Sequence, residues 1–309
     1  MSRAFHFRAP RLAAVGLLVS AAACADAPTA SPDALLARGG PKAAPNSEGR
    51  IIFGSFMTGN HDIFSVNPDG SGLRRLTYDG LDEMYPAVSP DGRKIAYLKA
   101  RTSGPPKLDL WIMNADGSRQ QMRLQAPDDI YSINPPAWAP DGKSLLISWQ
   151  DNITAQMHIA TLPVNSGAPV ELPIQGILAS YSPDGQYLAY MKDVNGARQL
   201  FTSRPDGSDP YQWTDLTNCC GIPRWSPDGT RVLFAADIGG YTLAATNSTG
   251  NWNILQTGAP PLGSGAWSPD GAKIVFASGP GDLWVSLANG AGATPILMGA
   301  MAYSMSWSR

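Results

Sequence analysis

The sequence contains few of the residues that metal and redox chemistry use. Its 309 residues include only 3 Cys and 3 His. Two of the histidines, His61 and His158, lie beyond the first 24 residues, and two isolated imidazoles do not make a metal site. The Asp-Gly pairs have the pattern of turns and not the spacing of an EF-hand loop. The sequence therefore predicts no metal and no cofactor.

A large excess of positive or negative charge is also missing. The formal net charge is -2, and no cluster of Lys and Arg occurs anywhere along the chain. Proteins that bind nucleic acid present a basic patch or stripe to the phosphates. This composition excludes nucleic acid as a partner. A Gly-x-Ser-x-Gly elbow, which would present a serine nucleophile, is absent as well.

Long apolar runs are absent except near the start. Arg3, Arg8 and Arg11 precede the apolar run 12–19, and small residues follow it. A positive start, a short apolar stretch and small residues are typical of an export signal. The run is too short to span a bilayer.

The predicted signal ends at a cysteine. Ser20-Ala-Ala-Ala-Cys24 resembles the lipobox of bacterial lipoproteins, which implies a signal peptide over residues 1–24 and a diacylglycerol on Cys24. Ala25 follows where Asp would imply retention at the inner membrane, so the resemblance implies an outer-membrane anchor facing the periplasm. Ala21 stands where lipoboxes more often have Leu or Val, and the same small residues fit ordinary secretory cleavage. A soluble periplasmic or secreted protein remains the alternative.

Residues 25–49 show no hydrophobic period. They are rich in Ala, Pro, Ser and Gly with scattered charge. Such a composition predicts a flexible tether between the anchor and a folded body.

Six repeats organise the rest of the chain. Each is marked by an aromatic or apolar residue in front of a Ser-Pro-Asp-Gly type of turn, and successive marks lie 50, 43, 44, 42 and 40 residues apart. A second series of turns, most of them beginning with Asn, occurs at a similar place in each repeat after its mark. Repeats of this length accommodate four short strands with their turns, as in the blades of a propeller. The marks, called the register residues below, are Val88, Trp138, Tyr181, Trp225, Trp267 and Trp307.

The turns and the segments after them predict hairpins. Pro in Ser-Pro-Asp-Gly fits the φ of a type I turn, and Gly tolerates a left-handed conformation. Apolar runs of strand length follow, such as Lys94-Ile-Ala-Tyr-Leu and Lys273-Ile-Val-Phe-Ala. Their near-continuous apolarity predicts strands covered on both faces, as they are between neighbouring blades. No helical pattern occurs after the leader.

The phase of the two ends predicts how the ring closes. The repeats begin with 51–54, the strand that elsewhere follows the turn, and finish with 304–309, the strand that elsewhere precedes it. The two segments complete one blade between them and leave no free edge. We therefore predict an all-β fold over residues 50–309, a six-bladed propeller of four-stranded blades closed by its N- and C-terminal strands.

The repeat resembles that of TolB-like propellers. The resemblance rests on Trp-Ser-Pro-Asp-Gly, the Ile-Ala-Phe type of strand, Asn-x-Asp-Gly-Ser and Leu-Arg-Arg-Leu-Thr, in five or six copies over about residues 50–309. Prolyl-peptidase propellers have a similar repeat. The chain departs from TolB itself, because it lacks the preceding α/β domain and carries a lipobox.

The predicted function is that of a non-catalytic envelope lipoprotein whose propeller binds a protein or a cell-wall ligand as a monomer. A peptidase of the prolyl-peptidase type would need an α/β-hydrolase domain, for which the propeller leaves no residues. The resemblance also implies an alternative, because some TolB-like propellers are metal-dependent polysaccharide lyases. A carbohydrate-active or hydrolytic enzyme that uses the central channel therefore remains open.

Two connections between blades are the predicted partner-binding loops. Segments 79–85 and 128–134 occupy equivalent positions in adjacent repeats and combine carboxylates with tyrosines, a composition suited to a polar partner surface. Solvated loop charge is the ordinary alternative. The candidate binding residues are Asp82, Glu83, Tyr85, Asp129, Tyr131 and Asn134.

Cys219 and Cys220 are adjacent, in a segment that we expect to be a loop before Trp225. Neighbouring Cα atoms are 3.8 Å apart, below the usual minimum for a disulfide, so a bridge between them would be strained. Two buried or slowly oxidised thiols are the simpler interpretation, and a redox role is the alternative.

Overall fold

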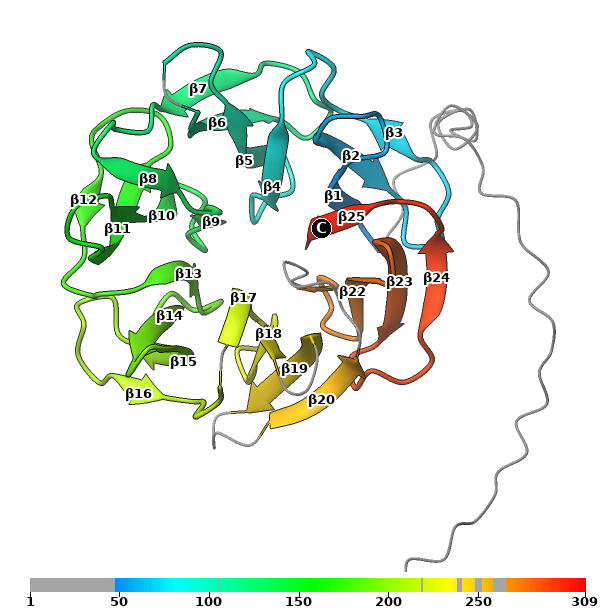
Figure 1. The fold of residues 1–309 in the computed structure, drawn as a ribbon. Helices are drawn as coiled ribbons and strands as arrows, with labels where there is room; N and C mark the ends of the chain where they lie inside the picture. Colours follow the sequence, from blue (N-terminus) through cyan, green and yellow to red (C-terminus); the bar gives the residue numbers. More distant parts are fainter. Residues whose placement is uncertain (1–47, 105, 218, 238–240, 248–251, 258–264) are drawn as a thin grey trace, which may run out of the picture.

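The computed structural model describes residues 48–309 except 105, 218, 238–240, 248–251 and 258–264. This part of the chain consists of strands and turns arranged as six sheets around a central axis (Figure 1). No helix long and apolar enough to cross a membrane occurs within the described ranges. The predicted signal peptide, Cys24 and nearly all of the predicted tether lie outside the described residues.

Each sheet is one blade, with its strands antiparallel and ordered from the axis outward (Figure 1). Blade 1 contains β25 (Ala302–Trp307), β1 (Ile51–Ser55), β2 (Asp62–Val66) and β3 (Arg74–Arg75). Blade 2 contains β4 (Glu83–Val88), β5 (Lys94–Ala100), β6 (Leu108–Asn114) and β7 (Gln121–Leu124). Blade 3 contains β8 (Ile130–Ile133) and β9 (Ala137–Trp138), which both pair with β10 (Ser144–Asp151), then β11 (Met157–Pro163) and β12 (Val170–Glu171).

The second half of the chain repeats the pattern. Blade 4 contains β13 (Ile177–Tyr181), β14 (Leu188–Val194), β15 (Ala197–Ser203) and β16 (Tyr211–Gln212). Blade 5 contains β17 (Cys219–Trp225), β18 (Arg231–Asp237), β19 (Tyr241–Asn247) and β20 (Trp252–Thr257). Blade 6 contains β21 (Ala266–Trp267), β22 (Lys273–Ser278), β23 (Asp282–Leu287) and β24 (Thr294–Leu297). The predicted fold, six blades of four-stranded type, is confirmed.

The ring closes in blade 1, where the last strand pairs with the first. Ile51 lies opposite Trp307 and Phe53 opposite Met305 in the antiparallel pair β1–β25. The backbone N–H of Arg50 donates to Ser308 Oγ at 3.0 Å, across 258 residues of sequence. The closure predicted from the phase of the two ends is therefore confirmed.

The Ser-Pro-Asp-Gly turns have the predicted geometry. In the first of them the N–H of Gly92 donates to the Ser89 carbonyl at 2.8 Å, and Gly92 has φ +71°. The Ser89 hydroxyl donates to Asp91 at 2.6 Å and accepts from the Lys94 N–H at 2.9 Å. The same bonds recur at Ser182, Ser226 and Ser268. Each turn is therefore stabilised by hydrogen bonds among its own four to six residues. For this reason the turn can be predicted from the local sequence.

The core lies between the blades. The second strand of each blade is covered on both faces, as its apolar run predicts: Ile95, Ala96, Tyr97 and Leu98 in β5 are all 0% exposed. One hydrophobic cluster joins blades 2 and 3, and another joins blades 6 and 1 through Val275, Phe53 and Met305.

Cys219 and Cys220 do not lie in a loop. They are the first two residues of β17, paired through the backbone with Ala236 and Ala235 of β18. The loop predicted before Trp225 is therefore wrong, because the seven-residue strand β17 extends back from Trp225 to Cys219.

Candidate functional site

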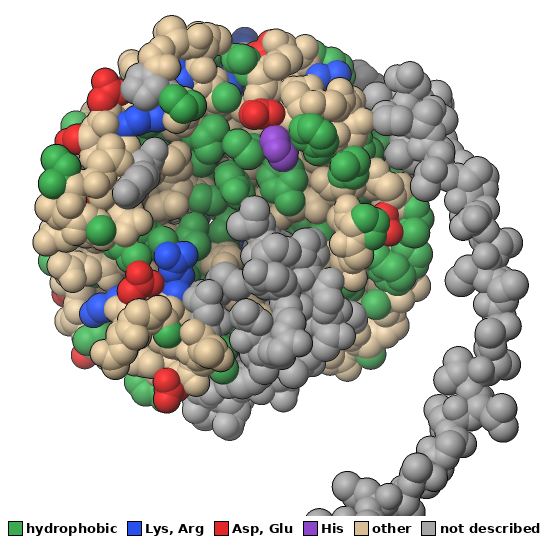
Figure 2. Space-filling model, viewed as in Figure 1, with side chains coloured by type: hydrophobic (Ala, Val, Ile, Leu, Met, Phe, Trp, Pro, Cys, Tyr) green, Lys and Arg blue, Asp and Glu red, His purple; other side chains and the backbone are tan. Residues whose placement is uncertain are grey.

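The propeller has two distinct ends. We call the end that carries the Ser-Pro-Asp-Gly turns the turn face, and the end where each outermost strand leads to the next blade the connection face. β4 runs from the connection face at Glu83 to the turn face at Val88, and the innermost strands of the other blades run the same way. The face toward the viewer in Figure 2 shows charged side chains of both signs scattered over the atoms not drawn in grey, with no broad patch of one sign.

The six predicted partner-binding residues lie at the connection face in blades 2 and 3. Asp82 directly precedes β4, and Glu83 and Tyr85 belong to that strand and not to the connection itself. Asp129 precedes β8, Tyr131 belongs to β8, and the N–H of Asn134 donates to the Ser148 carbonyl at 2.8 Å. The two groups occupy equivalent positions in neighbouring blades, as expected, but Glu83 is 0% exposed. Its carboxyl therefore cannot contact a partner in this structure.

Glu83 is a buried carboxyl with incomplete pairing. The Lys99 Nζ lies 3.2 Å from its Oε1, and the same ammonium pairs with Asp79. The side chains of Asp79 and Thr77 are also neighbours of this carboxyl, but neither of its oxygens has a well-formed hydrogen bond. Burial, with a smaller contribution from Asp79, raises the pKa of Glu83 to about 7.

Aromatic side chains of blades 1 and 2 lie beside Glu83. The Tyr303 hydroxyl donates to the Glu83 carbonyl at 3.3 Å, and the Tyr303 ring makes edge contacts with His61 and Tyr85 at centroid distances of 5.0 and 5.9 Å. Burial raises the pKa of both tyrosines. Tyr85 has φ 56°, a left-handed conformation that is strained for a bulky residue. The cluster of Lys99, His61 and Tyr303 around Glu83 could not be predicted, because it joins residues from three separate parts of the sequence.

The equivalent connection in blade 3 is held by two cations from blade 2. The Lys107 Nζ donates to the carbonyls of Pro127 and Ile130 at 2.7 and 2.6 Å. Arg101 pairs with Asp109 at 2.8 Å and with Asp128 at 3.3 Å. Asp129 is exposed and the side chain of Tyr131 is outside the described part. A partner-binding role for this connection stays a prediction.

The two histidines lie apart. Within the described ranges, no group of three His, Cys, Asp or Glu side chains is placed to hold a metal ion. His158 lies in β11. Its ring stacks on Trp149, and its Nδ1 and Nε2 lie 2.6 and 3.2 Å from Glu171 and Asp151.

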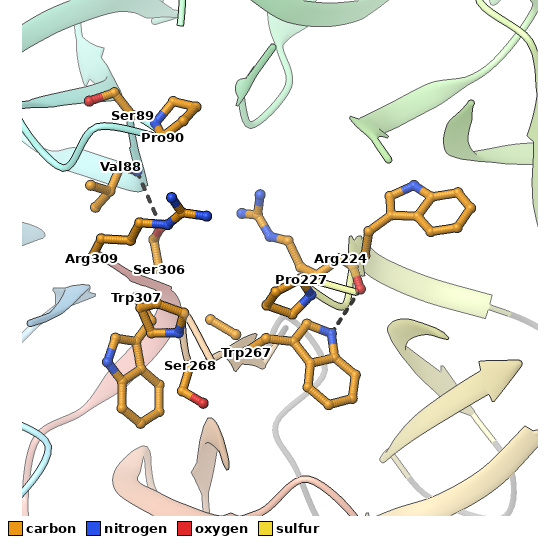
Figure 3. A pocket seen from close by; sticks show the side chains of 13 residues that line it. Val88, Ser89, Pro90, Arg224, Pro227, Trp267, Ser268, Ser306, Trp307 and Arg309 are labelled. Carbon is orange, nitrogen blue, oxygen red and sulfur yellow. Dashed lines mark hydrogen bonds between the residues drawn. The ribbon is translucent and has the colours of Figure 1, made fainter. Parts of the chain in front are cut away.

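The turn face carries two adjoining cavities at the mouth of the channel, of about 340 and 220 Å³. Both are lined by Val88, Arg224, Trp225, Ser306 and Arg309 (Figure 3). All six register residues, one from each blade, take part in their walls. The residues that mark the repeats in the sequence are thus also the residues that surround this mouth.

Three buried polar atoms of this lining have no partner. They are Ser180 Oγ, Arg224 Nε and Trp225 Nε1. The equivalent indole N–H groups are satisfied in three other blades: Trp138 donates to the Ala87 carbonyl at 2.8 Å, Trp267 to the Arg224 carbonyl at 3.1 Å and Trp307 to the Glu48 carbonyl at 2.8 Å. Burial lowers the pKa of Arg224 to about 10. The wall formed by blades 4 and 5 is therefore the polar and unsatisfied part of the mouth.

This difference predicts unequal effects of two matched substitutions. Trp138→Phe leaves the buried Ala87 carbonyl without its donor, and we expect it to lower the free energy of unfolding by about 1–3 kcal/mol beyond the loss of ring volume. Trp225→Phe removes an N–H that has no partner, so we expect only the volume effect that both variants share. Urea unfolding of the two variants and the wild type measures the difference. Equal losses would contradict the assignment.

Sequence reasoning placed the candidate site at the connection face, whereas these cavities lie at the turn face. Arg224, Ser180 and Arg309 were missed. A signal for two of them was present, because Ser180 and Arg224 each directly precede a register residue. Nothing in the sequence shows that the register residues meet around one cavity, since this follows only from closing the ring.

Comparison with known proteins agrees with this architecture. Residues 84–308 match the TolB beta propeller domain. The chain is similar to TolB from Acinetobacter baumannii, with a TM-score of 0.72 and 19% identity, covering 84% of this chain and 67% of that one. At this identity the structural likeness shows the fold alone.

Curated relatives share only a part of their length with this chain. A TolB homolog from Chlorobium luteolum is 31% identical over 156 residues, which are 49% of this chain and 33% of the relative. An uncharacterized peptidase, YuxL, from Bacillus subtilis is 26% identical over 159 residues, 50% of this chain and 22% of the relative. Because the family match covers most of the six blades described above, the chain belongs to the TolB beta propeller domain family.

Proposed function

We propose that this chain is a non-catalytic binding protein of the bacterial cell envelope, and that its propeller binds a protein or cell-wall ligand at the turn-face mouth. The single observation that carries the proposal is the cavity pair to which all six blades contribute a register residue. The described residues of its lining are mainly Trp, Pro, Ser and Arg, and include no Asp, Glu or His side chain. Flat aromatic walls with a few polar donors are typical of binding sites.

A pull-down tests this proposal and separates the two faces. Tyr181→Ala with Arg309→Glu changes the turn-face mouth, and Asp82→Ala with Tyr131→Ala changes the connection face predicted from the sequence. We expect crosslinking in envelope membranes to capture a partner with the wild type and the connection-face variant, and to lose it with the mouth variant. Loss in the connection-face variant alone would place the partner at the other end of the propeller.

The predicted leader and the family both support an envelope location. We propose that Cys24 carries a diacylglycerol and anchors the propeller to the outer membrane, facing the periplasm. Labelled palmitate is expected on the wild type and not on Cys24→Ala, because that thiol is the acceptor. Cys219→Ala is the control and should stay labelled. An unlabelled wild type found in the soluble fraction would instead favour ordinary secretion.

A second candidate function is a carbohydrate-active or hydrolytic enzyme. The pKa of Glu83, about 7, is that of a group able to exchange a proton near neutral pH. This carboxyl is 0% exposed and lines neither turn-face cavity, so the geometry favours binding. Glu83→Gln is therefore a further control in the same pull-down, and we expect it to keep the partner.

A further inference from the structure

Two arginines converge at the turn-face mouth. The side chains of Arg224 from β17 and Arg309, just after β25, extend toward one another over the cavity (Figure 3). The Nε of Arg224 is buried and has no partner, whereas the residue as a whole is half-buried. Within the described ranges, neither guanidinium forms an ion pair with a carboxylate, unlike Arg75, Arg101, Arg198 and Arg204.

Three aspartates of the turn face form hydrogen bonds within their own turns rather than ion pairs with the two arginines. Asp91, Asp184 and Asp270 each accept a hydrogen bond of 2.6 Å from the serine hydroxyl of their own turn. Each also accepts from a backbone N–H two residues further along the chain. These bonds hold the carboxylates within their turns. Burial alone lowers the pKa of Arg224, with no opposing contribution from an acidic neighbour.

A partly buried positive charge without a partner is unfavourable, and a second like charge beside it adds repulsion. An anion between the two guanidinium groups would remove both penalties. Guanidinium groups are planar and donate paired hydrogen bonds, a geometry that fits carboxylate and phosphate oxygens. The unsatisfied Ser180 Oγ and Trp225 Nε1 lie in the same wall.

We propose that the turn-face mouth is an anion-binding site, in which Arg224 and Arg309 together hold the carboxylate or phosphate group of a ligand whose apolar body lies against the surrounding Trp and Pro side chains. This inference rests on the proposed function and adds the chemical class of its ligand. The volumes of about 340 and 220 Å³ admit a small organic anion or one acidic group of a larger partner.

The test uses the purified protein and three probes: inorganic phosphate, citrate and benzoate, at constant pH and ionic strength. Tryptophan fluorescence and the melting temperature report binding, because Trp225, Trp267 and Trp307 line the site. We expect saturable binding to the wild type and about tenfold or greater weakening in Arg309→Gln and in Arg224→Gln. Arg93→Gln is the matched control, because it removes an equal charge from an exposed position on the same face.

Each result supports or overturns the assignment. If Arg224→Gln does not fold, as judged by circular dichroism, Arg224→Lys and the exposed Arg309→Gln decide. Binding of phosphate alone identifies a phosphate ligand, and binding of citrate or benzoate alone identifies a carboxylate. No saturable binding of any probe, or equal binding by Arg309→Gln and the wild type, overturns the inference. If the pull-down still captures a partner with the wild type and loses it with the mouth variant, the proposed function stands even though the anion-binding inference fails.

Discussion

Deletion of residues 303–309 is expected to lower the melting temperature by at least about 10 °C, or to prevent folding altogether. The deletion removes nearly all of β25, which is the innermost strand of blade 1 and the only partner of β1 on the inner side. It also exposes the edge of β1 and opens the cluster that joins blades 6 and 1. An ordinary trim of a chain end has no such effect.

The size of the effect follows from the buried side chains of the strand. Met305 is 0% and Trp307 8% exposed, and truncating a buried Met or Trp to Ala costs about 2–5 kcal/mol each. Each kcal/mol shifts the melting temperature of a domain of this size by about 2–4 °C. We expect Met305→Ala to give an intermediate loss, and Arg309→Ser, at an exposed position, to give little. A deletion variant that melts with the wild type would refute the closure.

The second large effect concerns the dependence of stability on pH. Because burial raises the pKa of Glu83 to about 7, the folded protein favours the protonated carboxyl. Its contribution to stability is complete below the unfolded pKa, near 4.5, and is lost as the pH rises through about 7. The shift corresponds to on the order of 3 kcal/mol. Over this range the wild type should become less stable as the pH increases.

Glu83→Gln removes the titrating group and keeps its shape. We expect the difference in free energy of unfolding between pH 4.5 and 7.5, measured in urea, to shrink by on the order of 3 kcal/mol relative to the wild type. Asp129→Asn, which changes an exposed carboxylate at the equivalent connection of the next blade, should keep the wild-type slope. If the free energy of unfolding of Glu83→Gln changes with pH as steeply as that of the wild type, Glu83 is ionised over the whole range and is held by Lys99.

The fold could be predicted because its determinants are local and repeated. A turn such as Ser89 to Lys94 is fixed by its own residues, and the phase of 51–54 against 304–309 is sufficient to predict the closing pair. The burial of Glu83 depends instead on Tyr303, which lies 220 positions away in sequence. The polar wall at Ser180 and Arg224 likewise forms only between blades. No local pattern carries such information, so the sequence pointed only to the connection face and not to the cavities at the turn face.

The pairing of β1 with β25 has a consequence for the biogenesis of the protein. The bond between Arg50 and Ser308 spans 258 residues, so blade 1 lacks its inner strand until nearly all of the chain has been synthesised. Contacts of such long range are slow to form, because the intervening polypeptide must first be ordered. A nascent chain therefore stays open, with an unpaired strand edge, during translation. Such a delay suits a polypeptide that is translocated before it folds, and it leaves the open edge for a chaperone to protect.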